Sequence, residues 1–252
     1  MQLLVSAASA ADATAALEGG ADIVDAKDPA AGALGAVTPD VLREIFAAVG
    51  GARLVTAALG DAADEAEVEQ AAREAAAAGA ALVKIGFANT TSVERATALT
   101  RAVVRGAASG GAQHAGVVVV GYADAPHGAL AFDRVIEVAR AGGARGVLAD
   151  TAQKDGPGLF ALVPPDVVAA WVTEARSAGL LVALAGKLTA AELPAARAAG
   201  AHIVGVRGAA CNGGRGGQVS AEQVRARRAV CHATALTDPA SVAGPRHAAA
   251  QH

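Results

Sequence analysis

Short apolar runs recur along the chain at regular intervals, and an Ala-rich stretch with helical periodicity follows each of them. Eight runs predict buried β-strands, at residues 3–7, 21–27, 53–59, 81–86, 116–124, 146–151, 180–186 and 202–208. Helix starts are marked by Pro39, Ser92, Pro165 and Ser220, and helix ends by Gly20, Gly79, Gly143, Gly179 and Gly200. Strict alternation allows an open doubly wound sheet or a closed barrel, and the count of eight favours the barrel. We therefore expect an α/β fold, a single-domain (β/α)8 TIM barrel.

The 252 residues of the chain are a length that one α/β barrel commonly fills. The alternating pattern runs through residues 1–232, which we predict to be the catalytic barrel domain. Residues 233–252 lose the pattern and collect Pro, Ala, Ser and His. We predict that they form a flexible C-terminal tail rather than a second domain.

The composition narrows the class of protein. Hydrophobic residues make up 53% of the chain but aromatic residues only 2%, so the core must be built from Ala, Val, Leu and Ile. The net charge is −3 and no basic run occurs, which argues against nucleic-acid binding. No window approaches the roughly 18 apolar residues of a membrane span, and the N-terminus lacks the basic start of a signal peptide. Because Cys211 and Cys231 show no metal-ligand spacing, we interpret them as free thiols and expect a cytoplasmic protein that acts on small molecules.

Lysine is scarce, and its positions are informative. Only four of the 21 basic residues are lysines, and each lies at or just after the carboxyl half of a predicted strand: Lys27, Lys84, Lys154 and Lys187. That end of a barrel is where active sites form. A desolvated amine can lose its proton and then attack a carbonyl group or act as a base, which a guanidinium cannot do. One such lysine would more often reach solvent or pair with a carboxylate, but four together indicate chemistry.

Strand periodicity predicts which charged groups can meet. Asp25 and Lys27 share one face of the second strand, Lys84 lies in the fourth strand and Asp150 in the sixth. Because alternate strands of a barrel contribute to the same interior layers, these four side chains can converge. Clustered like charges lower the pKa of one amine, which makes it nucleophilic near neutral pH.

Candidate substrate contacts lie at the ends of other strands. Tyr122 and Asp124 end the fifth strand and add a phenol and a carboxylate to the same rim, although a simple cap on the barrel explains the tyrosine equally well. Barrel enzymes often hold phosphate on the loops after strands seven and eight. The candidates there are Gly186, Arg207 and Gly208, with Lys187 and Arg215 as charge partners. The six histidines show no metal-ligand spacing, so we expect no metal site.

Six blocks of the sequence resemble one known family. They are "LLVS", "GGADIVDAKDPAAGALGA", "VKIG", "GYADA", "LADTAQKDG" and "IVGVRGAAC", and they look like the (5-formylfuran-3-yl)methyl phosphate synthase family, in order, over residues 1 to about 232. The resemblance implies a TIM-barrel lyase that makes the furan precursor of methanofuran-type one-carbon carriers from two molecules of glyceraldehyde 3-phosphate. It also implies a homo-oligomer, and the chemistry requires no metal or organic cofactor.

The resemblance further assigns roles to individual residues. It implies that Lys27 is the Schiff-base lysine, that Lys84 is the proton acceptor, and that Asp25 and Lys154 support catalysis. Our hypothesis is that one triose isomerises to its ketone form and becomes an imine on Lys27, after which the enamine adds to the second aldehyde. Asp25 would orient Lys27, while Asp150 or Lys154 would assist dehydration.

Two other functions are compatible with the residues. One is a different Schiff-base aldolase that acts on another sugar phosphate. The other is a barrel that binds phosphorylated metabolites without turning them over. A furan product, which absorbs in the near ultraviolet, would distinguish the synthase from both.

Overall fold

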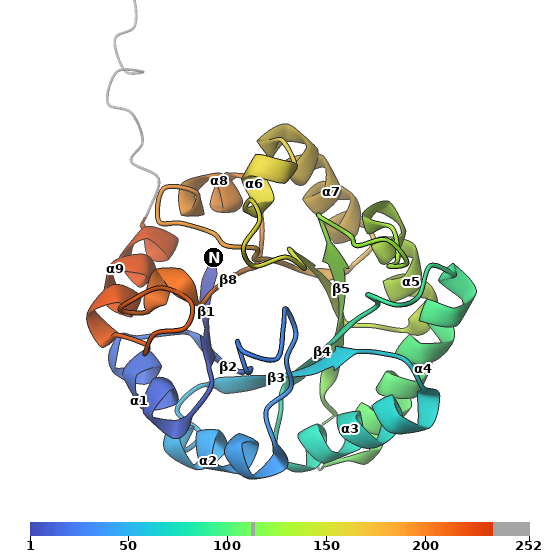
Figure 1. Ribbon diagram of the computed structural model, residues 1–252, viewed down its shortest axis with the longest axis horizontal. Coiled ribbons are helices and arrows are strands. Elements are labelled where there is room, and N and C mark those ends of the chain that lie inside the picture. The colour runs from blue at the N-terminus through green and yellow to red at the C-terminus, as the bar shows by residue number, and fades with distance from the viewer. Residues whose placement is uncertain (112–113, 234–252) are drawn as a thin grey trace, which may run out of the picture.

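Eight parallel strands close into a barrel in the computed structural model, which describes residues 1–111 and 114–233 (Figure 1). Each strand pairs with its neighbours in the sequence, and β8 pairs with β1. The strands are β1 (Gln2–Ala7), β2 (Ile23–Ala26), β3 (Leu54–Asp61), β4 (Leu82–Gly86), β5 (Gly116–Tyr122), β6 (Gly146–Asp150), β7 (Leu181–Leu184) and β8 (Ile203–Val206). The predicted barrel is confirmed, and the predicted tail lies outside the described residues except for its first position.

Helices surround the barrel, and every predicted helical stretch contains one (Figure 1). They are α1 (Ala10–Glu18), α2 (Pro39–Val49), α3 (Glu65–Ala77), α4 (Val93–Ser109), α5 (Val135–Gly142), α6 (Leu159–Leu162), α7 (Pro165–Ser177), α8 (Leu193–Ala198) and α9 (Ala221–His232). The four-residue α6 is an addition that the sequence pattern did not predict. Two 3-10 turns, η1 (Phe132–Arg134) and η2 (Gly208–Ala210), complete the helical segments of the described chain.

The helix boundaries follow from local chemistry. The side chains of Ser92 and Ser220 accept hydrogen bonds from the first turns of α4 and α9, and prolines occupy the first turns of α2 and α7. Left-handed backbone occurs at all five glycines that the pattern placed at helix ends, with φ of 82°, 105°, 77°, 78° and 86° at Gly20, Gly79, Gly143, Gly179 and Gly200. The predicted helix starts and helix ends are therefore confirmed.

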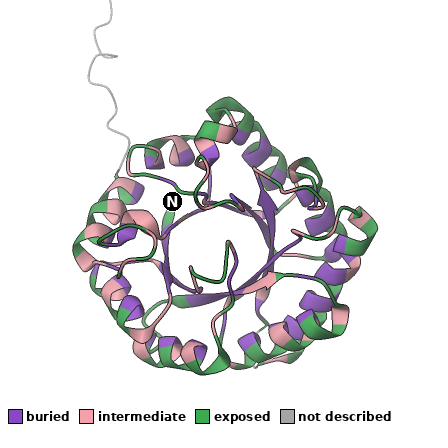
Figure 2. Ribbon diagram, viewed as in Figure 1, coloured by how far each residue is buried: buried purple, intermediate pink, exposed green. Residues whose placement is uncertain are grey.

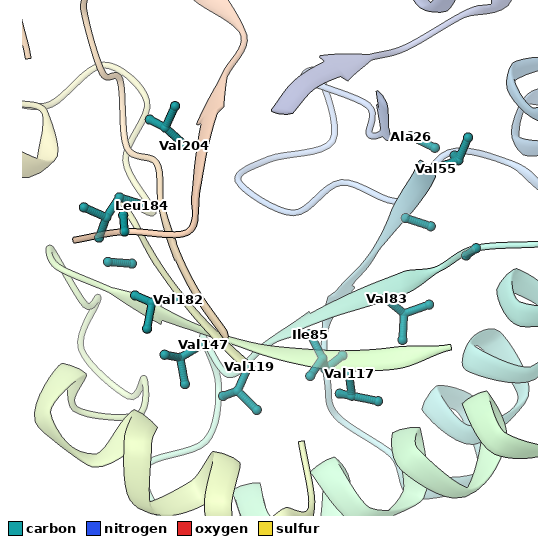
Figure 3. Close-up of a cluster of buried hydrophobic side chains, with 14 of the residues drawn as sticks. Ala26, Val55, Val83, Ile85, Val117, Val119, Val147, Val182, Leu184 and Val204 are labelled. Atoms are coloured by element: carbon teal, nitrogen blue, oxygen red, sulfur yellow. The ribbon is translucent and has the colours of Figure 1, made fainter. Parts of the chain in front are cut away.

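The core has two parts, one on each side of the barrel wall. Outward-facing strand residues such as Val83, Val119 and Val182 pack against the helices (Figure 3). A smaller apolar cluster fills the inside of the barrel and includes Ile23 and Leu148. Figure 2 shows most of the strand residues as buried, as expected for a parallel sheet that is covered on both faces. Small aliphatic side chains make up most of both parts, as the composition predicts.

The loop between β2 and α2 turns inward over the mouth of the barrel (Figure 1). Its Leu34 is 1% exposed and belongs to the cluster inside the barrel. The backbone N–H of Asp28 donates to the carbonyl of Gly35, which closes the loop on itself. At Gly35 a Cβ would lie 2.3 Å from the Asp28 carbonyl oxygen, so only glycine fits this turn.

Two further features concern the class of protein. Within residues 1–111 and 114–233, no helix is both long enough and apolar enough to cross a bilayer. Cys211 and Cys231 are buried and form no disulfide.

Candidate active site

A cavity of about 450 Å³ opens at the carboxyl ends of the strands. All four lysines of the chain line it, together with Asp25 and Asp150. Interior-facing apolar side chains of β1, β5 and β8, among them Leu4, Val118 and Ile203, form its floor. The predicted gathering of lysines at one end of the barrel is therefore confirmed.

Asp25 is the most enclosed charged group of the cavity. Its carboxylate is 0% exposed and accepts hydrogen bonds from Lys84 Nζ at 2.5 Å, Thr56 Oγ1 at 2.7 Å and Ser6 Oγ at 3.1 Å. Strand register explains the cluster, because Ser6 and Thr56 are the residues paired with Asp25 on β1 and β3. The buried carboxylate therefore has one amine and two hydroxyl donors, and Asp25 and Lys84 form a hydrogen-bonded pair suited to acid–base chemistry.

A second group surrounds Asp150 at the end of β6. Lys27 Nζ lies 3.6 Å from Asp150 Oδ2, and Lys154 Nζ lies 2.7 Å from Asp150 Oδ1. Lys154 also donates to the backbone carbonyl of Thr151, and the N–H of Thr151 donates to Asp150 at 2.7 Å. One carboxylate therefore holds two amines, and of these Lys27 is in looser contact with it.

Electrostatics separate Lys27 from an ordinary lysine. Burial lowers the pKa of Lys27 from 10.5 to about 8; Asp150 acts against this effect, while Lys84 and Lys154 add to it. Burial by itself would raise the pKa of Asp150, but the two neighbouring ammonium groups and the Thr151 N–H hold it below its usual value. With a pKa of about 8, roughly a tenth of Lys27 is a neutral amine at pH 7, far more than for an ordinary lysine, and it lies beside an ionised carboxylate.

The pairing of charges differs from the expected one. We expected Asp25 to orient Lys27, since the two residues share a face of β2. The carboxylate of Asp25 instead pairs with Lys84, and the carboxylate nearest to Lys27 belongs to Asp150. The reason is that Asp25 and Lys27 lie side by side on one strand, whereas Lys84 projects into the same interior from β4, two strands away, and Asp150 from β6, the strand opposite β2.

The loops after β7 and β8 form another part of the cavity. Gly186 and Lys187 both have left-handed backbone, with φ of 89° and 58°, and Lys187 is the sole non-glycine residue of the described chain with positive φ. Their backbone N–H groups donate to no acceptor within the described residues. Lys187 Nζ donates to the carbonyl of Gly156, and Gly208 opens η2 at the end of β8. Free N–H groups beside a lysine are suited to binding a phosphate.

The two arginines of the β8 loop have different surroundings. Arg207 lines the cavity, but its guanidinium is used by Asp12 at 2.6 Å and by the carbonyls of Ser6, Arg215 and Gly217. Arg215 also lines the cavity and donates only to backbone carbonyls, those of Pro29 and Gly32 in the inward-turning loop. Within the described residues, Arg215 therefore forms no ion pair with a carboxylate.

Tyr122 and Asp124 do not line the cavity. The Tyr122 hydroxyl donates to Asp61 Oδ1 at 2.9 Å, and burial together with Asp61 raises the pKa of the phenol. Asp124 accepts from the backbone N–H of Ala152 and of Gln153, so it holds the segment that leads to Lys154. Their predicted role in substrate binding stays a prediction, and within the described residues their contacts are with the protein itself.

Sequence reasoning missed four residues that shape the site. Ser6 and Thr56 could have been found, because each is a polar residue at an inward position of an apolar strand, in register with Asp25. Asp12 gave no such signal, since it lies in the first turn of α1 and meets Arg207 from the far end of the chain. Arg227 of α9 lines the cavity from outside the barrel wall.

No group of three or more His, Cys, Asp or Glu side chains among the described residues is arranged to hold a metal ion.

Comparison with known proteins identifies relatives over nearly the whole barrel. The family model for 4-HFC-P synthase matches residues 3–228. A (5-formylfuran-3-yl)methyl phosphate synthase from Methanopyrus kandleri is 42% identical over 215 residues, which cover 84% of this chain and 90% of that protein. The protein of the same name from Methanococcus maripaludis is 38% identical over 235 residues, covering 92% of this chain and 99% of the relative.

Solved structures support the fold. KGPDC from Streptococcus mutans superimposes with a TM-score of 0.64 at 15% identity, covering 91% of this chain and 96% of that one. A 3-hexulose-6-phosphate synthase gives a TM-score of 0.60 at 23% identity, covering 91% and 99%. At these identities the likeness concerns the barrel architecture alone. The match over residues 3–228 and the two synthases, by contrast, establish that the chain belongs to the (5-formylfuran-3-yl)methyl phosphate synthase family of enzymes.

Proposed function

We propose that this enzyme condenses two molecules of glyceraldehyde 3-phosphate through a Schiff base on Lys27. The observation that carries the proposal is a buried amine with a pKa of about 8 inside a cavity that also holds two buried carboxylates. A neutral amine attacks a carbonyl carbon, and the resulting iminium is a strong electrophile. The product would serve methanofuran-type cofactor biosynthesis.

The atoms balance for this reaction. Two triose phosphates contain six carbons and two phosphates, and the furan phosphate contains six carbons and one phosphate. The difference corresponds to one phosphoric acid and two water molecules. No oxidant or reductant is required, because isomerisation of one triose to its ketone only moves hydrogen within that molecule.

The carbon skeleton of the product decides which partner is the nucleophile. In (5-formylfuran-3-yl)methyl phosphate, the ring carbon that bears the phosphorylated CH2 group is also bonded to two other ring carbons. We assign this ring carbon to the central carbon of the ketone triose. Lys27 converts that central carbon to an iminium, and the new carbon–carbon bond forms at the same carbon. An enamine adding to the second aldehyde, our hypothesis from sequence, would join the wrong carbons.

The nucleophile therefore comes from the second triose. Removal of the proton from its central carbon expels the phosphate and leaves an enol, whose terminal CH2 attacks the iminium carbon. Release of Lys27 then forms a carbon–carbon double bond. The free hydroxyl of the first triose closes on the ketone of the second, and loss of water completes the furan. One water leaves when the imine forms and the other after ring closure.

The paired charges match the proton transfers in this route. The Lys84–Asp25 pair supplies one group that accepts a proton and one that donates a proton, for isomerisation and for the proton removal that expels phosphate. Asp150 stabilises the iminium on Lys27, and Lys154 beside it donates a proton to the departing hydroxyl. The free N–H groups of Gly186 and Lys187, with the charge of Arg215, bind phosphate.

Incubation of the purified protein with glyceraldehyde 3-phosphate alone tests the proposal. We expect release of one phosphate per furan, followed by near-ultraviolet absorbance and phosphate assay. Borohydride added during turnover should leave a reduced adduct on Lys27, located by peptide mass spectrometry. A furan without an adduct would remove the imine route but keep the reaction. An ordinary aldol product would indicate a different Schiff-base aldolase, and binding without any product would indicate a metabolite-binding barrel.

A further inference from the structure

One cation of the cavity comes from a helix outside the barrel wall. Arg227 lies in the middle of α9, which follows η2 and packs against β1 and α8. In Figure 1 this helix stands beside β1 and β8. Arg227 lines the cavity together with Leu188 and Thr189 of the β7 loop and Ala209 of η2. A long side chain on a helix points toward its N-terminal end, which here is the end at the mouth of the barrel.

The guanidinium of Arg227 is incompletely satisfied. Its Nη2 donates to Gln223 Oε1 at 2.9 Å, while its Nε is buried and has no hydrogen-bond partner within the described residues. No carboxylate of the described residues forms an ion pair with Arg227, whereas Arg207, which directly follows β8, is paired with Asp12. Buried donors in native proteins nearly always have an acceptor, so an unpartnered one beside a cavity indicates a ligand that supplies it.

Two other arginines of α9 show that Arg227 is distinguished by its position at the cavity and not by the number of arginines on the helix. Arg228 also has a buried Nε without a partner, but its charge faces Asp22 at the amino end of β2, away from the cavity. Arg225 is exposed and donates to the carbonyl of Glu18. Neither lines the cavity. Arg227 combines cavity contact, an unpartnered donor and an uncompensated charge.

We propose that Arg227 is an anion-binding residue of the cavity, which takes a phosphoryl group of the substrate between α9 and the β7 and β8 loops. That the phosphoryl group belongs to a triose phosphate rests on the proposed function. Two triose phosphates bring two dianionic groups, and three cations of this region have no carboxylate partner within the described residues: Lys187, Arg215 and Arg227. A fork of N–H donors is well matched to phosphate oxygens.

Calorimetry with inorganic phosphate tests the site without reference to any reaction. We expect the wild-type protein to bind phosphate, Arg227→Gln to weaken binding about 10- to 100-fold, and Arg227→Lys to retain an intermediate affinity, since it keeps the charge but loses the fork. Arg225→Gln, on the same helix, is the matched control and should bind like the wild type. Equal phosphate affinity of Arg227→Gln and the wild type, with both folded, would overturn the proposal.

Kinetics separate this proposal from the proposed function. Arg227→Gln should raise the KM for glyceraldehyde 3-phosphate about 10- to 100-fold and change kcat far less. A protein that binds phosphate through Arg227 but makes no furan would contradict the proposed function alone. If Arg227→Gln does not fold, phenylglyoxal modification of the wild-type protein replaces it. Phosphate should protect Arg227 and leave Arg225 reactive, and equal reactivity with and without phosphate would contradict the site.

Discussion

Two halves of one cavity carry cations in opposite electrostatic settings. In the half built on β2, β4 and β6, each amine faces a buried carboxylate: Lys84 faces Asp25, while Lys27 and Lys154 face Asp150. In the half built on β7, β8 and α9, the side chains of Lys187 and Arg215 donate to backbone carbonyls, and Arg227 donates to an amide. The first half sets three amines against two carboxylates, and the second holds three cations that have no carboxylate partner within the described residues.

This difference separates acid–base chemistry from anion binding. A paired amine and carboxylate can pass a proton without leaving an uncompensated buried charge, which suits a site for several proton transfers. Unpaired cations would lower the stability of an empty cavity but are compensated when a phosphate enters. Arg207 illustrates the rule from within the second half, because Asp12 neutralises it and it holds loop carbonyls instead.

The largest effect is expected from Lys27→Arg. The variant keeps a positive charge but cannot form an imine, so turnover should fall by about 10⁴-fold or more, measured as furan formation. Phosphate binding should stay within roughly threefold of the wild type, because the half that binds anions is intact. A variant that kept a borohydride-trapped adduct at another lysine would show that the nucleophile is misassigned.

Asp25→Asn should lower kcat by about 10²- to 10⁴-fold, since Lys84 loses its proton partner. The variant should also be less stable by about 3–5 kcal/mol, because the buried ammonium of Lys84 is left without a counter-charge. Urea denaturation measures the second effect. Thr56→Val is the control: it removes one hydrogen bond to Asp25 but no charge, and should cost only about 1 kcal/mol.

Arg215→Gln should raise KM by about 10- to 100-fold and change kcat much less, because the guanidinium contributes binding rather than proton transfer. Initial rates over a range of glyceraldehyde 3-phosphate concentrations measure both parameters. A fall in kcat at unchanged KM would mean that Arg215 acts mainly by holding the inward-turning loop through Pro29 and Gly32.

The pH dependence of kcat/KM should report the protonation of Lys27. Below its pKa of about 8 the amine is protonated, so kcat/KM should rise about tenfold per pH unit up to that value and level off above it. The same depression means that Lys27 lowers stability below pH 8, and that this effect disappears as the pH rises to 10.5. Asp150→Asn should move the break in the profile to lower pH, since Asp150 favours the charged amine. An unchanged break would assign the titration to another group.

The smallest effect is expected from Lys187→Gly. Glycine adopts left-handed backbone freely, so the substitution should raise the free energy of unfolding by up to about 1 kcal/mol. Loss of the ammonium should at the same time raise KM severalfold. Thermal unfolding and initial rates measure the two effects. A loss of stability would show that the contact of Lys187 with Gly156 outweighs the backbone strain.

Most of the barrel followed from local patterns. Apolar runs, Ala-rich helical stretches and glycines at helix ends are properties of neighbouring residues, and all of them act in the structure as expected. The four-residue α6 was not predicted, because a single turn of helix is too short to show a periodic pattern. In the site, the scarcity of lysine and its strand-end positions predicted that the four lysines line one cavity.

The sequence by itself determined the architecture and which amines meet at its carboxyl end, because strand period and strand count depend only on order along the chain. The tertiary structure decided which charge faces which. Asp25 pairs with Lys84 and not with Lys27, Arg207 is neutralised by Asp12 from the opposite end of the chain, and Arg227 enters from a helix. These pairings depend on the register of the strands across the closed barrel and on how far each side chain reaches. The spacing of residues along the sequence predicts neither of them.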